Sequence, residues 1–134
     1  SFISSKLRAG TEWKYKVVAY KKHGNSVVKN VGSQISSVTL PTAPVVVIRA
    51  GKGSVTLGWN GVTGADGYEV YMRTTKKGKS TKIATLKKAS KVKYTKKGLA
   101  KNKTYYVNVR AFKKDAKGRK YYSSYLTVKA VKAK

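Results

Sequence analysis

The fold is decided by residues 99–111, which read LAKNKTYYVNVRA. From Tyr105 onward the side chains alternate in type, so that apolar residues fall on one side of an extended chain and mostly polar residues on the other. This period of two is typical of a β-strand with one buried face. The inward set is expected to be Tyr105, Val107, Val109 and Ala111.

The same pattern occurs a second time, near the start of the chain. Residues 7–22, LRAGTEWKYKVVAYKK, align with residues 99–114 at a shift of about 92 positions, and residues 2–40 as a whole align with residues 94–131. Identical residues in the two stretches are Leu7 and Leu99, Val17 and Val109, Ala19 and Ala111, and the Lys-Lys pairs at 21–22 and 113–114. A period of this length fits one small sandwich domain and is far longer than a solenoid repeat.

The rest of the chain predicts further short strands and no helix. Period-two patterns cover residues 55–59, 68–73 and 82–86. Glycine-containing turn clusters separate them. The only two prolines, Pro41 and Pro44, lie between the two copies and suit a short stiff connector. We therefore divide the chain into residues 1–40, a linker at 41–44 and a complete domain at 45–134.

The charge balance is strongly basic. There are 31 Lys and Arg residues against four Asp and Glu residues, a net charge of +27. Such a surface attracts any polyanion through largely non-specific, salt-screened forces. Most of the basic residues are Lys, whereas Arg is the residue that binds phosphate through two parallel hydrogen bonds. The composition therefore favours diffuse positive charge on a solvated surface over dedicated phosphate-binding sites.

Residues suited to catalysis or cofactor binding are scarce. The four acids Glu12, Asp66, Glu69 and Asp115 are scattered, and His23 lies alone in an expected hairpin loop. Without cysteine the chain can form neither a disulfide nor a thiolate metal site. No apolar run approaches the roughly 20 residues of a membrane span. We expect no enzyme activity, no metal and no cofactor.

Taken together, these features of residues 42–134 resemble a fibronectin type III domain. The likeness lies in a proline-led first strand, in Trp59 closing the second strand, in ADGYEVY at residues 65–71, and in residues 99–111. The last stretch resembles the family's Leu-x-Pro-x-Thr-x-Tyr-x-Val-x-Val-x-Ala motif, with Lys101 in place of Pro. The resemblance implies a seven-stranded, immunoglobulin-like β-sandwich in which strands one, two and five face strands three, four, six and seven.

The resemblance also implies core positions. Leu99 would close one end of the sandwich, and Tyr105 would sit at the tyrosine corner with its hydroxyl bonded to nearby backbone. In the first copy Trp13, which has no hydroxyl, takes the place of Tyr105. The expected structural core is Trp59, Tyr68, Val70, Leu99, Tyr105, Val107 and Val109, with Leu7 and Trp13 in the first copy.

In this scheme residues 2–40 supply only the last three strands of the first copy. A face carrying Trp13, Tyr15, Val17 and Ala19 cannot be buried by those strands alone. Three explanations stay open. The protein continues upstream, or a second chain donates the missing strands, or the segment packs on its neighbour.

One surface could bind a ligand. Strand alternation sends aromatic and basic residues outward on adjacent strands: Tyr71, Arg73, Tyr106, Arg110, Phe112 and Tyr125. Such a face could stack sugars or bases or pack on a partner. Alternatively, these cross-strand pairs simply stabilise an exposed sheet.

The resemblance, together with the basic charge, implies a non-catalytic spacer or adhesion module of a secreted or cell-wall protein of Gram-positive type. Its expected partners are anionic wall or matrix polymers such as teichoic acids and acidic polysaccharides, together with neighbouring domains. Specific glycan or protein binding is the main rival function. Nucleic-acid binding is a weaker one.

Overall fold

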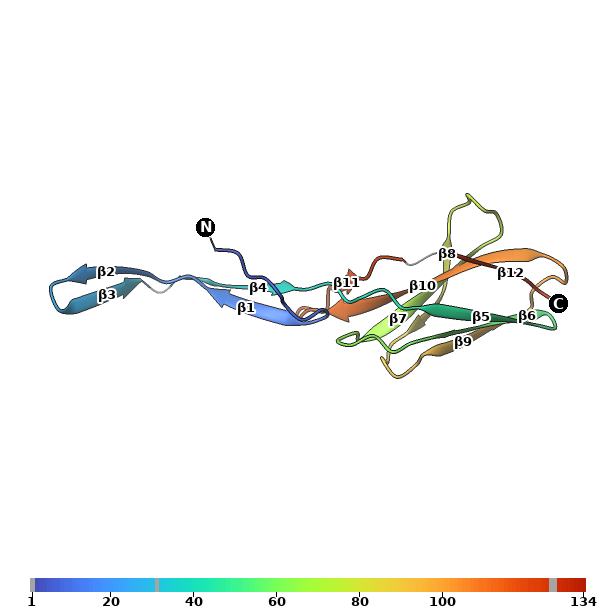
Figure 1. Ribbon diagram of the computed structural model, residues 1–134, viewed down its shortest axis with the longest axis horizontal. Helices are drawn as coiled ribbons and strands as arrows, with labels where there is room; N and C mark the ends of the chain where they lie inside the picture. The colour runs from blue at the N-terminus through green and yellow to red at the C-terminus, as the bar shows by residue number, and fades with distance from the viewer. Residues whose placement is uncertain (1, 31, 126–127) are drawn as a thin grey trace.

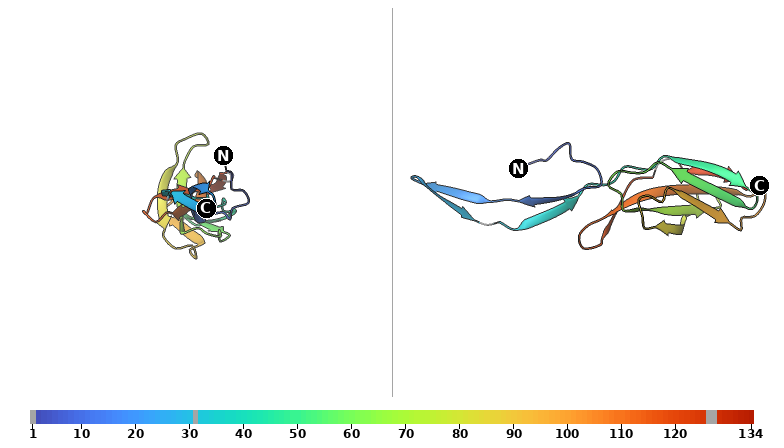
Figure 2. Two further views of the ribbon diagram at one scale, coloured as in Figure 1. Left: turned by 90° about the vertical axis from the view of Figure 1, so that its left-hand side faces the viewer. Right: turned by 90° about the horizontal axis from the view of Figure 1, so that it is seen from below.

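The computed structural model describes residues 2–30, 32–125 and 128–134. All regular structure in these residues is β-strand. The molecule is elongated, with a narrow two-stranded ribbon extending from a β-sandwich (Figure 1). The view down the long axis shows a small cross-section (Figure 2, left). In the view from below, the ribbon extends away from one end of the sandwich (Figure 2, right).

Residues 46–132 form the sandwich from two antiparallel sheets. The smaller sheet has the order β5-β6-β9. In the larger sheet the order is β11-β10-β7-β8, with β12 also paired to β10. The strands are β5 (Val46–Gly51), β6 (Ser54–Trp59), β7 (Gly67–Arg73), β8 (Thr81–Leu86), β9 (Lys93–Lys97), β10 (Thr104–Lys114), β11 (Lys120–Tyr122) and β12 (Lys129–Lys132). This is the expected order, with the seventh strand formed by β11 and β12.

The sandwich core lies between the facing sides of these sheets. Apolar side chains on alternate positions are removed from water there, which is the main stabilising contribution to such a fold. All seven residues expected in this core are buried: Trp59, Tyr68, Val70, Leu99, Tyr105, Val107 and Val109. The Tyr105 hydroxyl accepts a hydrogen bond from the Ala100 backbone N–H at 3.0 Å, so the tyrosine corner is formed.

The first copy is a ribbon of four short strands. β1 (Glu12–Lys16) pairs with β4 (Gln34–Val38), and β2 (Ala19–His23) pairs with β3 (Ser26–Asn30). We expected three strands, but residues 2–11 form none. In the complete copy the corresponding strand, β9, pairs only with β6, and residues 1–40 contain no counterpart of β6. Leu7 and Trp13, expected in a core, are only half-buried here.

The two copies nevertheless share a local backbone conformation. Lys6 and Gly98, 92 positions apart, both have positive φ angles, of 57° and 71°. Gly10 and Asn102, again 92 apart, have φ angles of 63° and 61°. A left-handed φ is uncommon for a residue with a side chain. Its recurrence at both positions supports the sequence alignment independently.

The ribbon and the sandwich meet closely. A Cβ atom placed on Gly10 would lie 2.8 Å from the carbonyl carbon of Gly64, in the loop between β6 and β7. Only glycine permits this approach of two backbones. Both linker prolines, Pro41 and Pro44, are also buried. The connection between the two copies is therefore packed against protein.

Candidate functional site

The candidate binding surface is the outer face of β7 and β10. These two strands pair antiparallel, so that Glu69 lies opposite Arg110, Tyr71 opposite Asn108, and Arg73 opposite Tyr106. Side chains at such cross-strand positions contact one another directly. The structure thus places Tyr71, Arg73, Tyr106 and Arg110 side by side on two paired strands.

Glu69 lies at the centre of this face, and its side chain is fully buried. Its two carboxylate oxygens accept hydrogen bonds or ion pairs from five surrounding side chains. The donor distances are 2.6 Å from Tyr71, 3.0 Å from Arg110, 3.0 Å from Lys120, 3.4 Å from Lys82 and 3.4 Å from Tyr122. We call these six residues the Glu69 cluster.

Electrostatics in the cluster strongly favour the charged carboxylate. Burial by itself would raise the pKa of Glu69, because it disfavours the ionised form. Hydrogen bonds from Tyr71, Lys120 and Arg110 outweigh burial and lower the pKa to about 2. Burial and the hydrogen bond to Glu69 raise the pKa of Tyr71. Glu69 is therefore an ion-pair partner at neutral pH, since a proton-transfer group needs a pKa near the working pH.

Arg110 is enclosed by aromatic rings as well as by Glu69. Its guanidinium carbon lies 3.5 Å from the ring centroid of Tyr122, 5.0 Å from that of Tyr71 and 5.6 Å from that of Tyr125. The Tyr71 hydroxyl accepts a further hydrogen bond from Arg110 at 2.5 Å. Both hydrogen bonds come from Nη2 of Arg110, whereas its buried Nε–H has no hydrogen-bond partner among the described residues.

Phe112 does not belong to the exposed surface, contrary to our expectation. Alternation does send it to the outer face, but its side chain is only 1% exposed. Phe112 lies opposite Gly67 in the sheet, and its ring occupies the space that a Gly67 side chain would need. Tyr122 and Lys120 then cover the ring, at 6.4 Å and 4.4 Å from its centroid.

The remaining candidates form the outer part of this surface. Tyr125 is 43% exposed and packs edge-on against Tyr71 at a centroid distance of 5.8 Å. Arg73 lies over the Tyr106 ring at 5.9 Å and donates a hydrogen bond to Ser80. Tyr125 is thus the most accessible aromatic group of this face.

Sequence reasoning missed three members of the cluster: Lys82, Lys120 and Tyr122. It also counted Glu69 among scattered acids. One available signal was the position of Glu69 on a strand expected to neighbour the strand of Arg110. Opposite charges on adjacent strands commonly pair across a sheet.

Two other acids are also neutralised within the sandwich. Asp66 binds the Lys113 ammonium at 3.0 Å and accepts a hydrogen bond from the Lys114 backbone N–H at 2.7 Å, which links it to β10. Asp115 pairs with Arg119 at 2.7 Å, and the hydrogen bonds from Arg119 lower its pKa. Three of the four acids of the chain therefore have basic partners.

Within residues 2–30, 32–125 and 128–134, no three His, Asp or Glu side chains come close enough to hold a metal ion. The same part of the chain contains no helix of the length and hydropathy needed to cross a membrane.

Comparison with solved structures establishes the class of fold. A Fn3-like protein from Clostridium thermocellum matches at 28% identity over 70% of this chain and 91% of its own, with a TM-score of 0.52. A two-domain fibronectin type III segment of chicken tenascin matches at 22% identity over 95% of this chain and 67% of its own, with a TM-score of 0.68. The protein has a fibronectin type III-like β-sandwich fold.

The same fold occurs inside larger proteins. A β-1,2-glucanase from Parabacteroides distasonis matches at 15% identity over 80% of this chain but only 17% of its own, with a TM-score of 0.57. No family model and no curated protein matches the sequence. Fibronectin type III domains are generally non-catalytic structural modules and are common in extracellular proteins. Their fold alone does not specify a ligand.

Proposed function

We propose that the chain is a non-catalytic spacer or adhesion module of a modular extracellular protein, and that its basic surface binds anionic cell-wall or matrix polymers. The observation that carries this proposal is the internal neutralisation of the acids. Glu69, Asp66 and Asp115 are each paired with basic side chains of the sandwich. The sandwich therefore presents a potential of nearly one sign to any polyanion.

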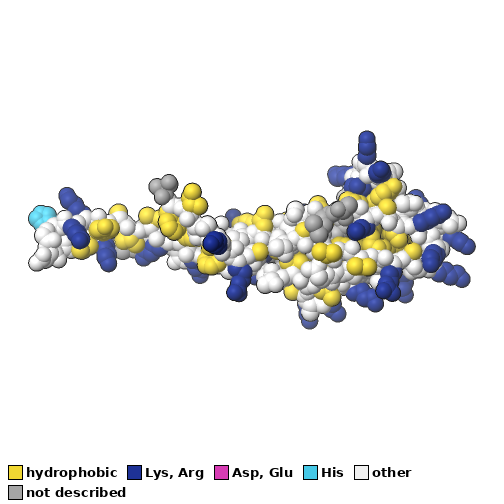
Figure 3. Space-filling view, in the orientation of Figure 1, with side chains coloured by type: hydrophobic (Ala, Val, Ile, Leu, Met, Phe, Trp, Pro, Cys, Tyr) yellow, Lys and Arg dark blue, Asp and Glu magenta, His cyan; other side chains and the backbone are white. Residues whose placement is uncertain are grey.

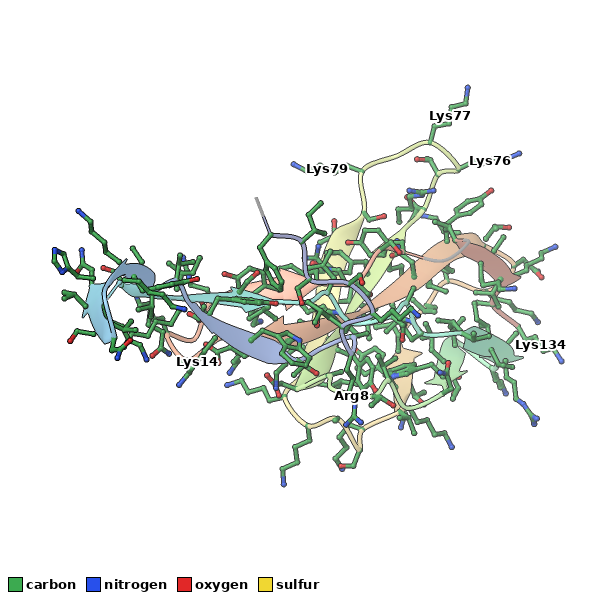
Figure 4. The ribbon with its side chains drawn as sticks, turned by 60° about the vertical axis from the view of Figure 1, so that its left-hand side comes forward. Arg8, Lys14, Lys76, Lys77, Lys79 and Lys134 are labelled. Atoms are coloured by element: carbon green, nitrogen blue, oxygen red, sulfur yellow. The ribbon has the colours of Figure 1, made fainter. Side chains whose placement is uncertain are left out.

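The distribution of charge fits loose attachment over a wide area. On the face drawn in Figure 3, basic side chains occur along both the ribbon and the sandwich. Lys76, Lys77 and Lys79 extend into solvent from the loop between β7 and β8 (Figure 4). These ammonium groups are separated, and each would contact a polymer charge independently. Affinity would then depend on the number of contacts.

A salt titration tests this function. The chain is titrated with a glycerol-phosphate teichoic acid, with neutral dextran as control, at increasing salt. We expect binding to the anionic polymer alone, with log affinity falling linearly against log salt as counterions are released. Binding should be lost at about 0.5 M salt, where the Debye length is about 4 Å.

Matched charge variants make the test sharper. Replacing Lys76, Lys77 and Lys79 by Gln should weaken binding and reduce the salt slope. A second triple variant at Lys87, Lys88 and Lys91, which are exposed between β8 and β9, should do so to a similar extent, because diffuse attraction depends on charge number more than position. If only one of the two variants loses affinity, a localised site exists and the diffuse model is wrong.

A second candidate function is glycan or protein binding by the aromatic face, and the exposed Tyr125 ring beside Tyr71 favours it. A glycan array distinguishes the two functions. Binding that survives about 0.5 M salt but is lost in Tyr125→Ala and Tyr106→Ala would support this second function. Nucleic acid is a further polyanion control, and steep salt dependence without base preference would indicate charge attraction only.

A further inference from the structure

Each copy has a corner turn just before β1 or β10, at Gly10 in the ribbon and at Asn102 in the complete copy. The Gly10 N–H donates a hydrogen bond to the Thr39 carbonyl at 3.1 Å, and the Asn102 N–H donates one to the Ala133 carbonyl at 2.9 Å. Thr39 and Ala133 directly follow the last strands of their copies, β4 and β12. Each corner turn is therefore fixed beside the end of its own copy, and in the ribbon this is where the linker to the sandwich begins.

The corner turn of the ribbon interlocks with the loop between β6 and β7. A Cβ atom placed on Gly64 would lie 2.6 Å from the Gly10 carbonyl oxygen and 2.9 Å from that of Ala9. Conversely, a Cβ atom on Gly10 would meet the Gly64 backbone at 2.8 Å. Both glycines also have positive φ angles, of 63° and 75°. Each position therefore favours glycine for two reasons, its own backbone angle and the approach of the other backbone.

The loop that receives the corner turn is held in place by the sandwich. Val62 and Ala65 are buried, and the Ala65 N–H donates a hydrogen bond to the Val62 carbonyl at 3.1 Å. The Val62 N–H donates one to the Tyr68 hydroxyl at 2.9 Å. The Asp66 N–H donates one to the Phe112 carbonyl at 2.8 Å, which ties the end of the loop to β10. The conformation of this loop is therefore determined by contacts within the sandwich.

The linker is attached to the same loop at a second point. The Val45 N–H donates a hydrogen bond at 2.6 Å to Oδ1 of Asn60, at the start of the loop. Pro41 and Pro44 are buried, and each has its φ angle fixed by its ring. Domains joined by a linker alone move relative to one another unless an interface holds them. Attachment at two points restricts rotation of the ribbon more than a single contact would.

We propose that the loop at residues 60–66 is a docking surface for the corner turn of the ribbon copy, and that it accepts only a corner turn with glycine at the position of Gly10. The two copies then form one rigid unit with a fixed relative orientation. The corner turn of the complete copy does not fit such a loop, because Asn102 carries the Cβ atom that the contact excludes. The proposal rests on the spacer role proposed above, but its test involves no polymer, so either can fail without the other.

Distance measurements between two spin labels test the proposal. The chain has no cysteine, so the substitutions Lys14→Cys and Lys93→Cys place one label on each copy. Both positions are exposed, on β1 and β9. Double electron–electron resonance then gives the distribution of distances between the labels. We expect a narrow distribution for this labelled protein, because the docked corner turn fixes the ribbon relative to the sandwich.

Two substitutions should release the ribbon. Gly10→Asn adds the excluded Cβ atom but keeps the backbone of the corner turn, since Asn102 itself adopts a φ angle of 61°. Gly64→Ala adds a Cβ atom on the other side of the contact. We expect either variant to widen the distance distribution about twofold or more, because domains without a packed interface reorient about their linker.

Two matched controls should leave the distribution narrow. Asn102→Gly makes the reverse exchange in the corner turn of the complete copy. Gly118→Ala introduces a side chain at a φ angle of 79°, close to that of Gly64, but its Cβ atom would meet no described atom within 4 Å. Gly10 lies outside the sandwich, so Gly10→Asn decides the outcome even where Gly64→Ala destabilises the sandwich.

Three results would overturn the proposal. The first is a broad distribution for the labelled protein that carries no further substitution. The second is a distribution that stays narrow in Gly10→Asn. The third is equal broadening in Asn102→Gly or Gly118→Ala, because the orientation of the ribbon would then not depend on the contact between Gly10 and Gly64.

Discussion

The two copies in this chain have related sequences but opposite surroundings. In the complete copy, β10 pairs with β7 and faces the sheet that contains β6, and Val109 is almost inaccessible to water. In the ribbon, the aligned Val17 is largely exposed. The strand pattern and the left-handed turn before it are the same in both. An alternating sequence thus determines which side chains share one face of a strand. Whether that face is buried depends on the other strands that pack against it.

The outer faces of the two copies differ as well. In the complete copy Arg110 is held by Glu69 and by tyrosine rings. The residue aligned with Arg110 in the ribbon is Val18, which has no charge to pair with an acid. The arginine at the centre of the Glu69 cluster is therefore not repeated in the ribbon. Comparable substitutions in the two copies should have very unequal effects.

The largest difference is expected between the acids of the two copies. Glu69→Ala would leave Arg110 and Lys120 close together without their counter-charge, and should reduce the free energy of unfolding by about 3–5 kcal/mol. Glu12→Ala, at the half-exposed start of β1, should change it by less than about 0.5 kcal/mol. Urea denaturation measures both. Similar losses for the two variants would mean that the cluster does not stabilise the sandwich.

The next difference concerns aligned valines. Val109→Ala removes two methyl groups from the core and should cost about 2 kcal/mol. The same change at Val17 should cost less than about 0.5 kcal/mol, because that side chain is already in water. Thermal and urea unfolding of both variants measure the difference in stability loss. A comparable loss at Val17 would imply that the ribbon face is covered in solution.

The pH dependence of stability should arise mainly from the complete copy. The folded-state pKa of Glu69, about 2, lies below its ordinary value of 4.5. Its contribution is therefore fully present above about pH 4.5 and is lost as the pH falls toward 2. Because the Lys82 and Lys120 side chains that pair with Glu69 are partly exposed and screened by solvent, we expect a loss of only about 1.5 kcal/mol.

Urea unfolding at a series of pH values measures this loss. Glu69→Gln supplies the control, because a neutral amide cannot titrate and its stability should vary less with acid. If the wild type and Glu69→Gln respond equally to acid, other carboxylates are responsible for the pH dependence.

Much of the fold could be predicted from the sequence because its determinants are local. Strand alternation and turn glycines identify the strands and their inward faces, and the inward residues from Trp59 to Val109 are buried. The strand order came from the family resemblance. The missing strand at residues 2–11 could not be predicted from local pattern, because it depends on a partner strand absent from residues 1–40.

The candidate site was predicted less completely. Alternation assigns a side chain to a face but does not say what covers it. Phe112 is buried because Gly67 opposite has no side chain, and Glu69 is buried because Lys82 and Lys120 reach it from other strands. Both facts require the register between strands, which the pattern of a single strand does not contain.

The smallest effect should come from the tyrosine corner. Tyr105→Phe keeps the buried ring but removes the acceptor of the Ala100 N–H, and should cost about 1 kcal/mol. The aligned Trp13 has no hydroxyl, so Trp13→Phe removes no such bond and should change stability by less than about 0.5 kcal/mol. Urea denaturation of both variants measures the difference. A negligible cost at Tyr105 would mean that water replaces the lost acceptor, and that the corner depends on ring packing alone.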